Sequence, residues 1–554
     1  MKRAVSFLCF AIFIFSSSLA QDIHVIHPSF HLLGKTFPIA IEAKSDGSLD
    51  RFHSSEINAT VSQVPSSTEI IKVKKGRGLA GVVSNQPGNL QLTAPELNIV
   101  VPENTDLPIY HSGTLTGAEV WPSGSIHIIS LNYEIASGAS LSIEEGCWVL
   151  LDSAVNITVN GSINALGTKD NPIAFGSNST SFNWGGVAVN LGIATFEYCL
   201  FTHGGGDNSQ AFGHSGSQAT LKSNGGVLAL KHSFIFDCAG KGIGAQNGFV
   251  SFTNGAISRC DMGGEFLGSS VQVSGSHILD IPNDDGLFVD DDNDGFYFGG
   301  TSSQTSNPSV LDSCVFMFGK DDAIDHNGAI LEVRNSWVEG FENEGIAASS
   351  ENSVFIYNSM FKNCEQGIEA GYGSPQVTVD HCLMLENENG IRFGDWYDWG
   401  CTGSIICTNS IISNNDDNVY NYDLLTEAPV IDAINLTYSI TNDFEYDNGL
   451  GCITGAPNFN AHYLLETGSP GIGIANDGSN MGLVSSLSTG VKEPPSFNHP
   501  LTAVSIYGID GRLVYHRATT IYNPTTIQQL SAGIYIVEKT YGVYKSNHKQ
   551  VVFR

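Results

Sequence analysis

The sequence predicts an all-β solenoid, in which short strands wind into a stack of similar coils. Segments of roughly 22 residues repeat in the middle of the chain, and the glycines of three copies are Gly345, Gly367 and Gly390. Each copy contains short stretches of alternating character, such as VTVD at 377–380, separated by Gly, Asn and Asp. A helical solenoid would need longer repeats with apolar residues at helical spacing. The unit is therefore a coil of strands, and stacking places equivalent residues about 4.8 Å apart.

Length, composition and charge narrow the possible partners. A chain of 554 residues predicts two or three domains. The 61 glycines and the low charged fraction of 15% are typical of a turn-rich β protein. Lys and Arg number 25 against 56 Asp and Glu, which gives a net charge of −31. This charge argues against nucleic acid or an anionic membrane as a partner, and cations are the expected counterparts.

The first 20 residues are typical of a secretion signal. Lys2 and Arg3 precede an apolar run that ends at Phe15, and small residues follow at Ser18 and Ala20. The run is too short to span a bilayer comfortably. We therefore expect a soluble mature chain without a membrane span, located outside the inner membrane.

Residues 21–116 lack the repeat and are expected to form a separate N-terminal module. Alternating strands flank a turn at 45–47, and the segment 34–47 is similar to the opening of a bacterial Ig-like sandwich. The solenoid is predicted from 117 to 481. Most cysteines lie inside its coils and are interpreted as buried thiols. Cys401, Cys407 and Cys452 follow the most regular coils, and one disulfide among them is an open alternative.

The repeat resembles the right-handed parallel β-helix of the pectate-lyase-like superfamily. The resemblance covers 117–481, and the phrases at 138–146, 160–168 and 184–187 are similar to the first coils of secreted bacterial β-helix proteins. It implies a polysaccharide-active protein, with lyases and glycoside hydrolases as the enzyme classes.

The end of the chain resembles the C-terminal sorting domain of type IX secretion. After a linker at 482–500, residues 501–554 contain two strand pairs bounded by turns and a basic-aromatic end. The resemblance implies the type IX machinery as a partner and export across the outer membrane. We expect a small β-sandwich here, and a monomer that is extracellular or attached to the cell surface.

Two columns of polar residues emerge when the coils are aligned on their Gly-Ile step. The first contains Asp285, Asp322, Glu344, Gln366, Asn389 and Asp417, and the second contains Phe288, Asp325, Ala347, Glu369, Arg392 and Tyr420. Carboxylates stacked at about 5 Å repel one another unless they share protons or a cation. Three interpretations stay open: a structural ladder, bound calcium, or catalysis.

An acidic loop at 290–295 predicts a calcium site. It supplies carboxylates at alternate positions and a glycine where the chain turns, but Thr301 replaces the glutamate that an EF-hand needs. The expected calcium ligands are Asp285, Asp290, Asp292 and Asp294.

An aromatic cluster adjoins the acidic columns. Trp396, Tyr397 and Trp399 offer flat faces on which sugar rings stack, so we expect them to bind substrate. Packing of this loop onto the solenoid is the alternative.

The two enzyme classes use different residues. In a lyase, calcium would neutralise a uronate carboxylate and Arg392 or Lys320 would remove the α-proton. In a hydrolase, Asp322 with Glu344, or Asp325 with Glu369, would act as the two carboxylates. The Gly-His-Gly motif of polygalacturonase-like enzymes is missing, because Glu344-Gly345 occupies that coil. A non-catalytic adhesin or glycan-binding protein is the third hypothesis.

Overall fold

The computed structural model describes residues 22–62, 67–283, 292–300, 308–443 and 445–487, together with the backbone of four C-terminal strands. The chain forms two compact units, which divide after Gly490. The predicted secretion signal and most of the predicted linker lie outside the described residues. The described part of the chain contains no helix that could pass through a lipid bilayer.

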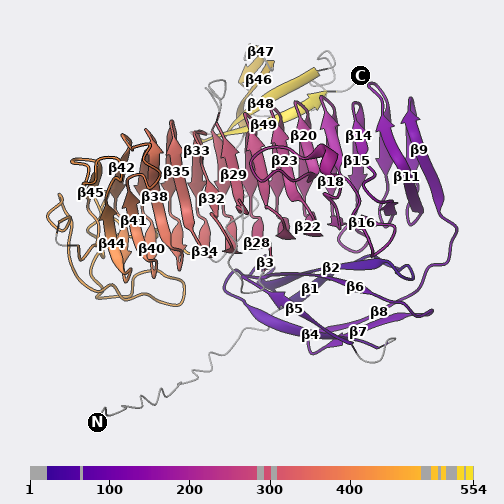
Figure 1. The fold of residues 1–554 in the computed structure, drawn as a ribbon, viewed down its shortest axis with the longest axis horizontal. Helices are drawn as coiled ribbons and strands as arrows, with labels where there is room; N and C mark the ends of the chain where they lie inside the picture. Colours follow the sequence, from indigo (N-terminus) through magenta and orange to yellow (C-terminus); the bar gives the residue numbers. More distant parts are fainter. Residues whose placement is uncertain are drawn as a thin grey trace, which may run out of the picture. The chain divides into compact units, whose positions relative to one another are not determined.

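The larger unit is a right-handed parallel β-helix, as the sequence predicted (Figure 1). Each full coil contributes one strand to each of three walls. Strands β9 (Ile109–Leu115) and β11 (Ile126–Ile135) begin the stack, so the first parallel strand precedes the expected start at 117. The first wall is a 13-stranded parallel sheet. Its members are β10 (Ala118–Trp121), β12 (Ser140–Ile143), β15 (Ser162–Leu166), β18 (Ile193–Glu197), β21 (Val227–Lys231), β24 (Phe249–Thr253), β27 (Ser270–Ser274), β30 (Ser309–Asp312), β33 (Leu331–Arg334), β36 (Ser353–Tyr357), β39 (Gln376–Asp380), β42 (Ser404–Thr408) and β45 (Ile434–Thr437).

The second and third walls follow one another within each coil. The second wall contains β13 (Trp148–Leu151), β16 (Ile173–Ser177), β19 (Cys199–Thr202), β22 (Phe234–Cys238), β25 (Ala256–Cys260), β28 (His277–Ile281), β31 (Val315–Gly319), β34 (Trp337–Phe341), β37 (Met360–Lys362), β40 (Leu383–Leu385) and β43 (Ile411–Ser413). The third wall contains β14 (Ile157–Val159), β17 (Val187–Asn190), β20 (Ala219–Asn224), β23 (Lys241–Gln246), β26 (Gly264–Leu267), β29 (Phe296–Gly299), β32 (Ile324–Asp325), β35 (Glu344–Ser350), β38 (Gln366–Gly373), β41 (Asn389–Phe393) and β44 (Asp417–Asn421).

Columns of identical chemistry hold the coils in register. Inside the solenoid, buried Ile, Val, Leu and Phe side chains form one continuous core. At the start of the second wall, Ser and Cys residues stack from coil to coil. The N–H of Cys314 donates to Ser336 Oγ (3.1 Å), and the N–H of Ser336 donates to Ser359 Oγ (3.1 Å). Each hydroxyl therefore satisfies a buried backbone donor of the neighbouring coil.

The ten described cysteines are all free thiols. Those within the coils are buried, which confirms their interpretation as small apolar core residues. The disulfide left open for Cys401, Cys407 and Cys452 is absent. Cys401 and Cys407 are buried in the core of the solenoid instead.

The N-terminal module is the predicted small β-sandwich. One four-stranded sheet contains β1 (Asp22–Ile26), β2 (Thr36–Ser45), β3 (Ser48–Leu49) and β6 (Arg77–Val83), and the other contains β4 (Ser55–Val61), β5 (Ser67–Val73), β7 (Leu90–Ala94) and β8 (Leu97–Val101). Buried Arg77 extends from it into the solenoid, where Nη1 donates to the carbonyls of Gly255 (2.7 Å) and Gly275 (2.8 Å). The module is thus fixed to the solenoid by buried hydrogen bonds.

The chain folds back along the solenoid after its last strand, β45. The N–H of Gly482 donates to the carbonyl of Asn409 (2.7 Å), and the N–H of Val484 donates to Asn358 Oδ1 (2.9 Å). The smaller unit contains one antiparallel sheet in the order β47 (Leu513–Ala518), β46 (Leu501–Gly508), β48 (Gly533–Tyr541) and β49 (Tyr544–Val552).

Candidate functional site

Strand register on the third wall determines which acids become neighbours. The outward column contains Tyr297, Asp325, Ala347, Glu369, Arg392 and Tyr420, each paired with the next along the stack. This is the predicted column, except that Tyr297 takes the place expected for Phe288. Accordingly, Asp294 rather than Asp285 precedes Asp322 in the neighbouring column. The sequence contains two similar Asp-Gly-apolar segments, at 285–287 and 294–296. The second leads into strand β29, which pairs with β32 and places Tyr297 beside Asp325.

A cavity of about 340 Å³ lies on this wall. We call it the acidic cleft. It collects most of the predicted site residues from five or more coils. Its lining is His214, Asp292, Tyr297, Asp322, Asp325, Asn327, Glu344, Ala347, Ala348, Ser349, Glu369, Gly371, Tyr372, Arg392, Asp395, Trp396, Tyr397 and Trp399. Lys320 is buried and does not belong to this lining. Asp285 and Asp290 lie outside the described residues.

Asp322 and Glu344 form a close pair across adjacent coils. The N–H of Glu344 donates to Asp322 Oδ1 (2.9 Å). Burial raises the pKa of Asp322 well above its usual range, and the Glu344 carboxyl, with which it shares a hydrogen bond, raises it further. Two carboxyls joined by a hydrogen bond are too close to stand on either side of a glycosidic bond. The pair therefore does not fit the acid and base roles expected for it.

Asp325 differs because it is only partly buried and borders the cavity. Desolvation raises the pKa of Asp325 to about 8, and the negative charge of Asp321 contributes in the same direction. Its Oδ1 accepts a hydrogen bond from the N–H of Asn327 (3.1 Å). At neutral pH this side chain is mostly a neutral acid that faces the cleft.

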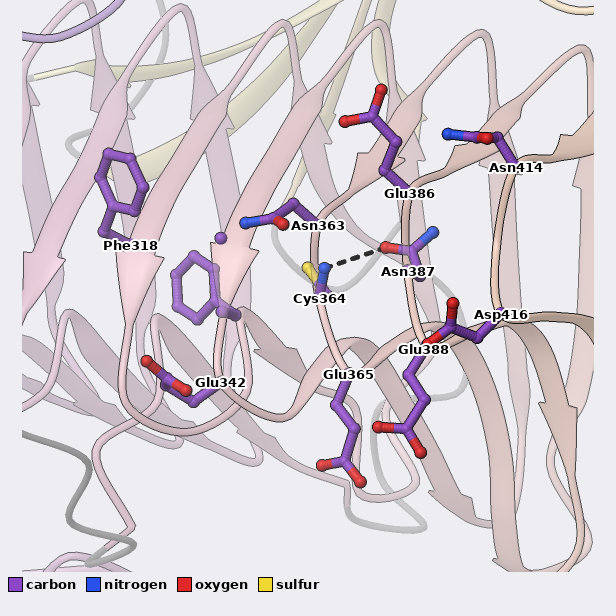
Figure 2. A pocket seen from close by; sticks show the side chains of 12 residues that line it. Phe318, Glu342, Asn363, Cys364, Glu365, Glu386, Asn387, Glu388, Asn414 and Asp416 are labelled. Atoms are coloured by element: carbon purple, nitrogen blue, oxygen red, sulfur yellow. Dashed lines mark hydrogen bonds between the residues drawn. The ribbon is translucent and has the colours of Figure 1, made fainter. Parts of the chain in front are cut away.

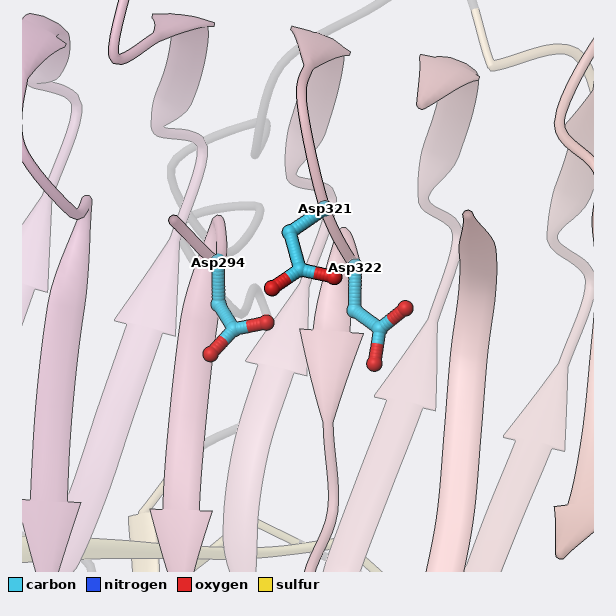
Figure 3. A group of neighbouring side chains, drawn as sticks. All are labelled: Asp294, Asp321 and Asp322. Atoms are coloured by element: carbon cyan, nitrogen blue, oxygen red, sulfur yellow. The ribbon is translucent and has the colours of Figure 1, made fainter. Parts of the chain in front are cut away.

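Three aspartates meet at the edge of the cleft (Figure 3). One carboxylate oxygen from each of Asp294, Asp321 and Asp322 lies within 4.8 Å of the others. Burial raises the pKa of Asp294 well above its usual range, and the charges of Asp325 and Asp321 add to this effect. Of the predicted calcium ligands, Asp294 joins this cluster, whereas Asp292 pairs with His214 Nε2 (2.9 Å).

Arg392 is the cation of the cleft lining, and it is almost fully buried. Its Nη1 forms an ion pair and hydrogen bond with Glu369, its neighbour one coil away. The ring of Trp396 lies 4.9 Å from the guanidinium carbon. Nε and Nη2 of Arg392 have no hydrogen-bond partner among the described residues. Burial lowers the pKa of Arg392, but the bond to Glu369 occupies the group that a lyase would need as a free base.

The buried carboxylate of Asp395 fixes the backbone of the loop at 396–400, which carries the three aromatic residues. Asp395 accepts hydrogen bonds from the N–H groups of Tyr397 (2.9 Å), Trp399 and Gly400 (2.7 Å). Trp396, Tyr397 and Trp399 are 47%, 69% and 65% exposed, so they do not form a packed cap. All three line the cleft, beside its acids.

Sequence reasoning missed the opposite side of the cleft. His214 comes from the loop between β19 and β20 and stacks on Tyr297 with ring centres 4.7 Å apart. Asn327 Nδ2 donates to the hydroxyl of Tyr297, and Tyr372 donates to Asn327 Oδ1 (3.2 Å). His214 lies outside every repeat, so no pattern identified it. The Asp-Gly phrase before Tyr297 was the one available signal for that residue.

A second, larger cavity of about 850 Å³ lies on the neighbouring turns (Figure 2). We call it the open groove. Its five acids are all exposed, and they are Glu342, Glu365, Glu386, Glu388 and Asp416. Between them, Asn387 Oδ1 accepts a hydrogen bond from the N–H of Cys364 (3.0 Å). This asparagine satisfies a backbone donor of the neighbouring coil, which is a structural role.

Comparison with known proteins adds three distant structural likenesses. A scan against family models and a search of curated proteins find no match. The chain is similar to an alginate lyase from a Paenibacillus species, with 15% identity, a TM-score of 0.27, and coverage of 53% of this chain and 97% of that one. It is similar to the catalytic unit of an alpha-1,3-glucanase from Streptomyces thermodiastaticus, with 10% identity, a TM-score of 0.34, and coverage of 79% and 95%. It is also similar to the A-module of a mannuronan C-5 epimerase from Azotobacter vinelandii, with 10% identity, a TM-score of 0.23, and coverage of 60% and 92%. At these TM-scores the likenesses do not indicate a function for this chain.

Proposed function

We propose that the protein is a polysaccharide-active enzyme that hydrolyses a glycosidic bond, with Asp325 as the general acid. The observation that carries this proposal is a carboxyl group with a pKa of about 8 that faces a cleft edged by aromatic rings. Glycoside hydrolysis needs a carboxylic acid that stays protonated at the working pH and donates its proton to the leaving oxygen. Asp325 combines that protonation state with access to substrate.

Glu369 is the best candidate for the second carboxylate. Asp325 pairs with Ala347, which pairs with Glu369, so two coil steps separate them. Two steps of about 4.8 Å place their backbones about 10 Å apart. This is close to the carboxyl separation of about 6.5–9.5 Å that leaves room for a water molecule in inverting enzymes. In this mechanism Glu369 activates the water while Asp325 protonates the leaving group.

The substrate we propose is an acidic polysaccharide. Nε and Nη2 of Arg392 lack partners, and buried donors without partners are costly. A uronate carboxylate would supply the missing acceptors once Trp396 moves off the guanidinium. The exposed faces of Tyr397 and Trp399 would bind the sugar rings.

A calcium-dependent lyase is the second candidate, and the cluster of Asp294, Asp321 and Asp322 favours it. Calcium binds oxygen ligands at about 2.3–2.6 Å, so three oxygens within 4.8 Å of one another can share one ion. Bound calcium would neutralise a substrate carboxylate and acidify its α-proton. Against this candidate, Lys320 does not line the cleft and Arg392 is paired with Glu369.

Product analysis of the chain without its first 20 residues separates the candidates. The protein is incubated with pectate, alginate and neutral glucans, with calcium or with a chelator. Hydrolysis yields new reducing ends without unsaturated sugars, and it persists in chelator. Unsaturated ends that need calcium would establish the lyase instead. Binding without any product would favour the non-catalytic adhesin.

We further propose that the protein is exported through the type IX machinery and acts outside the cell. The N-terminal signal and the order of strands β46 to β49 support this proposal. Fusion of residues 491–554 to a reporter in a type IX host tests it, because the reporter should appear outside the cell.

A further inference from the structure

A third cavity lies on the same wall as the acidic cleft, and its lining has a different chemistry. It has a volume of about 150 Å³. We call it the amide pocket. Four asparagines, two glutamines and one lysine dominate its lining, which is Asn132, Asn156, Thr158, Gly186, Val187, Ala188, Asn190, Gln210, Gln218, Ala219, Lys222 and Asn224. No carboxylate belongs to this lining. A lining of amides with one lysine therefore suits sugar hydroxyls and an anionic group rather than a cation.

The amide pocket and the acidic cleft share one column of the third wall. Ala188 pairs with Lys222, Lys222 with Gly244, Gly244 with Glu265, Glu265 with Tyr297, and Tyr297 with Asp325. Four coil steps of about 4.8 Å, or about 19 Å, separate Lys222 from Asp325, and Ala188 lies one step further. The loop at 203–218 covers the two coils between the cavities, because Phe212 packs on Gly244 and Glu265 is fully buried beneath His214. A polymer that reaches both cavities therefore passes over the exposed outer side of this loop.

The loop at 203–218 borders both cavities. Gln210 and Gln218 line the amide pocket, and His214 lines the acidic cleft. A fully buried ion pair holds the loop, because Lys241 Nζ lies 3.1 Å from Glu265 Oε2 and donates to the carbonyl of Ser217 (2.9 Å). Glu265 Oε1 in turn accepts the N–H of His214 (2.6 Å). The loop therefore fixes one edge of each cavity.

The amides of the pocket are already oriented by their neighbours. Asn156 Oδ1 accepts hydrogen bonds from the N–H of Gly186 (2.9 Å) and from Gln218 Nε2 (2.7 Å). Asn224 Nδ2 donates to Asn190 Oδ1 (2.8 Å), whereas Asn224 Oδ1 is buried without a partner. An unpaired buried acceptor favours a ligand hydroxyl.

Lys222 supplies the only charge in the lining. Its ammonium lies 3.5 Å from the centre of the Phe212 ring and pairs with no carboxylate among the described residues. A half-buried ammonium that is fixed on a ring and lacks a carboxylate partner is suited to an anionic group.

We propose that the amide pocket is a distal subsite that binds one uronate unit of the polymer whose backbone is cleaved in the acidic cleft. Lys222 pairs with the carboxylate of that unit, and the amides bind its hydroxyls. This proposal rests on the proposed function for its substrate class. It adds that recognition extends about 19 Å beyond the reacting bond, the distance of the four coil steps between Lys222 and Asp325.

Binding of oligouronates of increasing length tests the subsite. Oligogalacturonates and oligomannuronates, from dimers upward, are titrated calorimetrically into the full chain carrying Asp325→Asn, so that no hydrolysis occurs. The compared quantity is the ratio of long-oligomer to short-oligomer affinity. We expect it to rise by about tenfold or more at the length that reaches the pocket, because the second contact becomes intramolecular.

Adding Lys222→Met should abolish that rise, while Lys231→Met, an exposed lysine on the first wall, should preserve it. Unchanged unfolding midpoints of both variants show that the fold is intact. An equal affinity ratio with and without Lys222 overturns the subsite. Failure of the proposed function looks different, because the unaltered protein would then cleave no oligomer of any length.

Discussion

The acidic cleft and the open groove contain similar numbers of carboxylates, yet their physical states differ. The acids of the open groove are all exposed, although desolvation and the charges of Glu344 and Glu388 raise the pKa of Glu365 there. Those of the cleft are buried or half-buried, so desolvation and close neighbours raise the pKa of Asp322 and Asp325. Burial of an acid, rather than the number of acids, therefore distinguishes a candidate active site from a solvated face.

The largest expected difference concerns catalysis. Asp325→Asn should lower kcat by about 10²- to 10⁴-fold, because the amide cannot donate the proton that general acid catalysis requires. Glu388→Gln, in the open groove, should leave kcat unchanged. Reducing-end assays on the preferred polysaccharide measure both. Equal losses in the two variants would contradict the distinction between the cleft and the open groove.

The two cavities also differ in the strength of their ion pairs. Arg392→Met leaves Glu369 partly buried without its cation, and breaking a buried pair should cost about 3 kcal/mol of unfolding free energy or more. In the open groove, Glu386→Gln removes one of two carboxylate partners of Lys362; Glu386 is 49% exposed, and Glu339 remains 3.3 Å away. This change should cost about 1 kcal/mol or less. Urea denaturation compares them, and equal costs would refute the contrast.

The pH dependence of stability should carry the signature of Asp325. The pKa of Asp325 is about 8 in the folded chain, against about 3.8 for an aspartate in an unfolded chain. Between these values the folded state binds more protons than the unfolded state, so its contribution to stability is lost as pH rises. Asp325→Asn should therefore gain stability relative to the unaltered protein from pH 4 to pH 8. Denaturation in the presence of a chelator measures this trend, and a stability difference that stays constant over this pH range would contradict it.

The smallest effect is expected at the aromatic edge of the cleft. Replacing Tyr397 or Trp399 by Ala should raise KM by about two- to tenfold with little change in kcat, because each ring contributes about 0.5–1.5 kcal/mol of stacking. Phe355→Ala, an exposed ring on the first wall, is the matched control and should leave KM unchanged. A fall in kcat alone would contradict a binding role.

Repeat alignment predicted much of the site because a parallel β-helix converts sequence period into spatial neighbours. Glu369 and Arg392 became partners as the alignment required. The alignment went wrong at Asp285, because two Asp-Gly phrases compete within one enlarged coil and only strand pairing selects Asp294. His214 was unpredictable for a different reason, since its loop has no counterpart in other coils. Periodicity also does not indicate burial, which determines the pKa of each carboxyl.

The buried guanidinium of Arg77 has a consequence for the order of events during folding. Solenoids normally assemble by adding each coil to the one before it, through contacts that are local in sequence. Arg77 instead bonds to carbonyls that lie 178 and 198 residues further along the chain. The N-terminal module, although synthesised first, can complete these bonds only after half a dozen coils have stacked. Contacts between residues so far apart in sequence slow folding. The N-terminal module can therefore reach its final position only when the coils around 255–275 are correctly stacked.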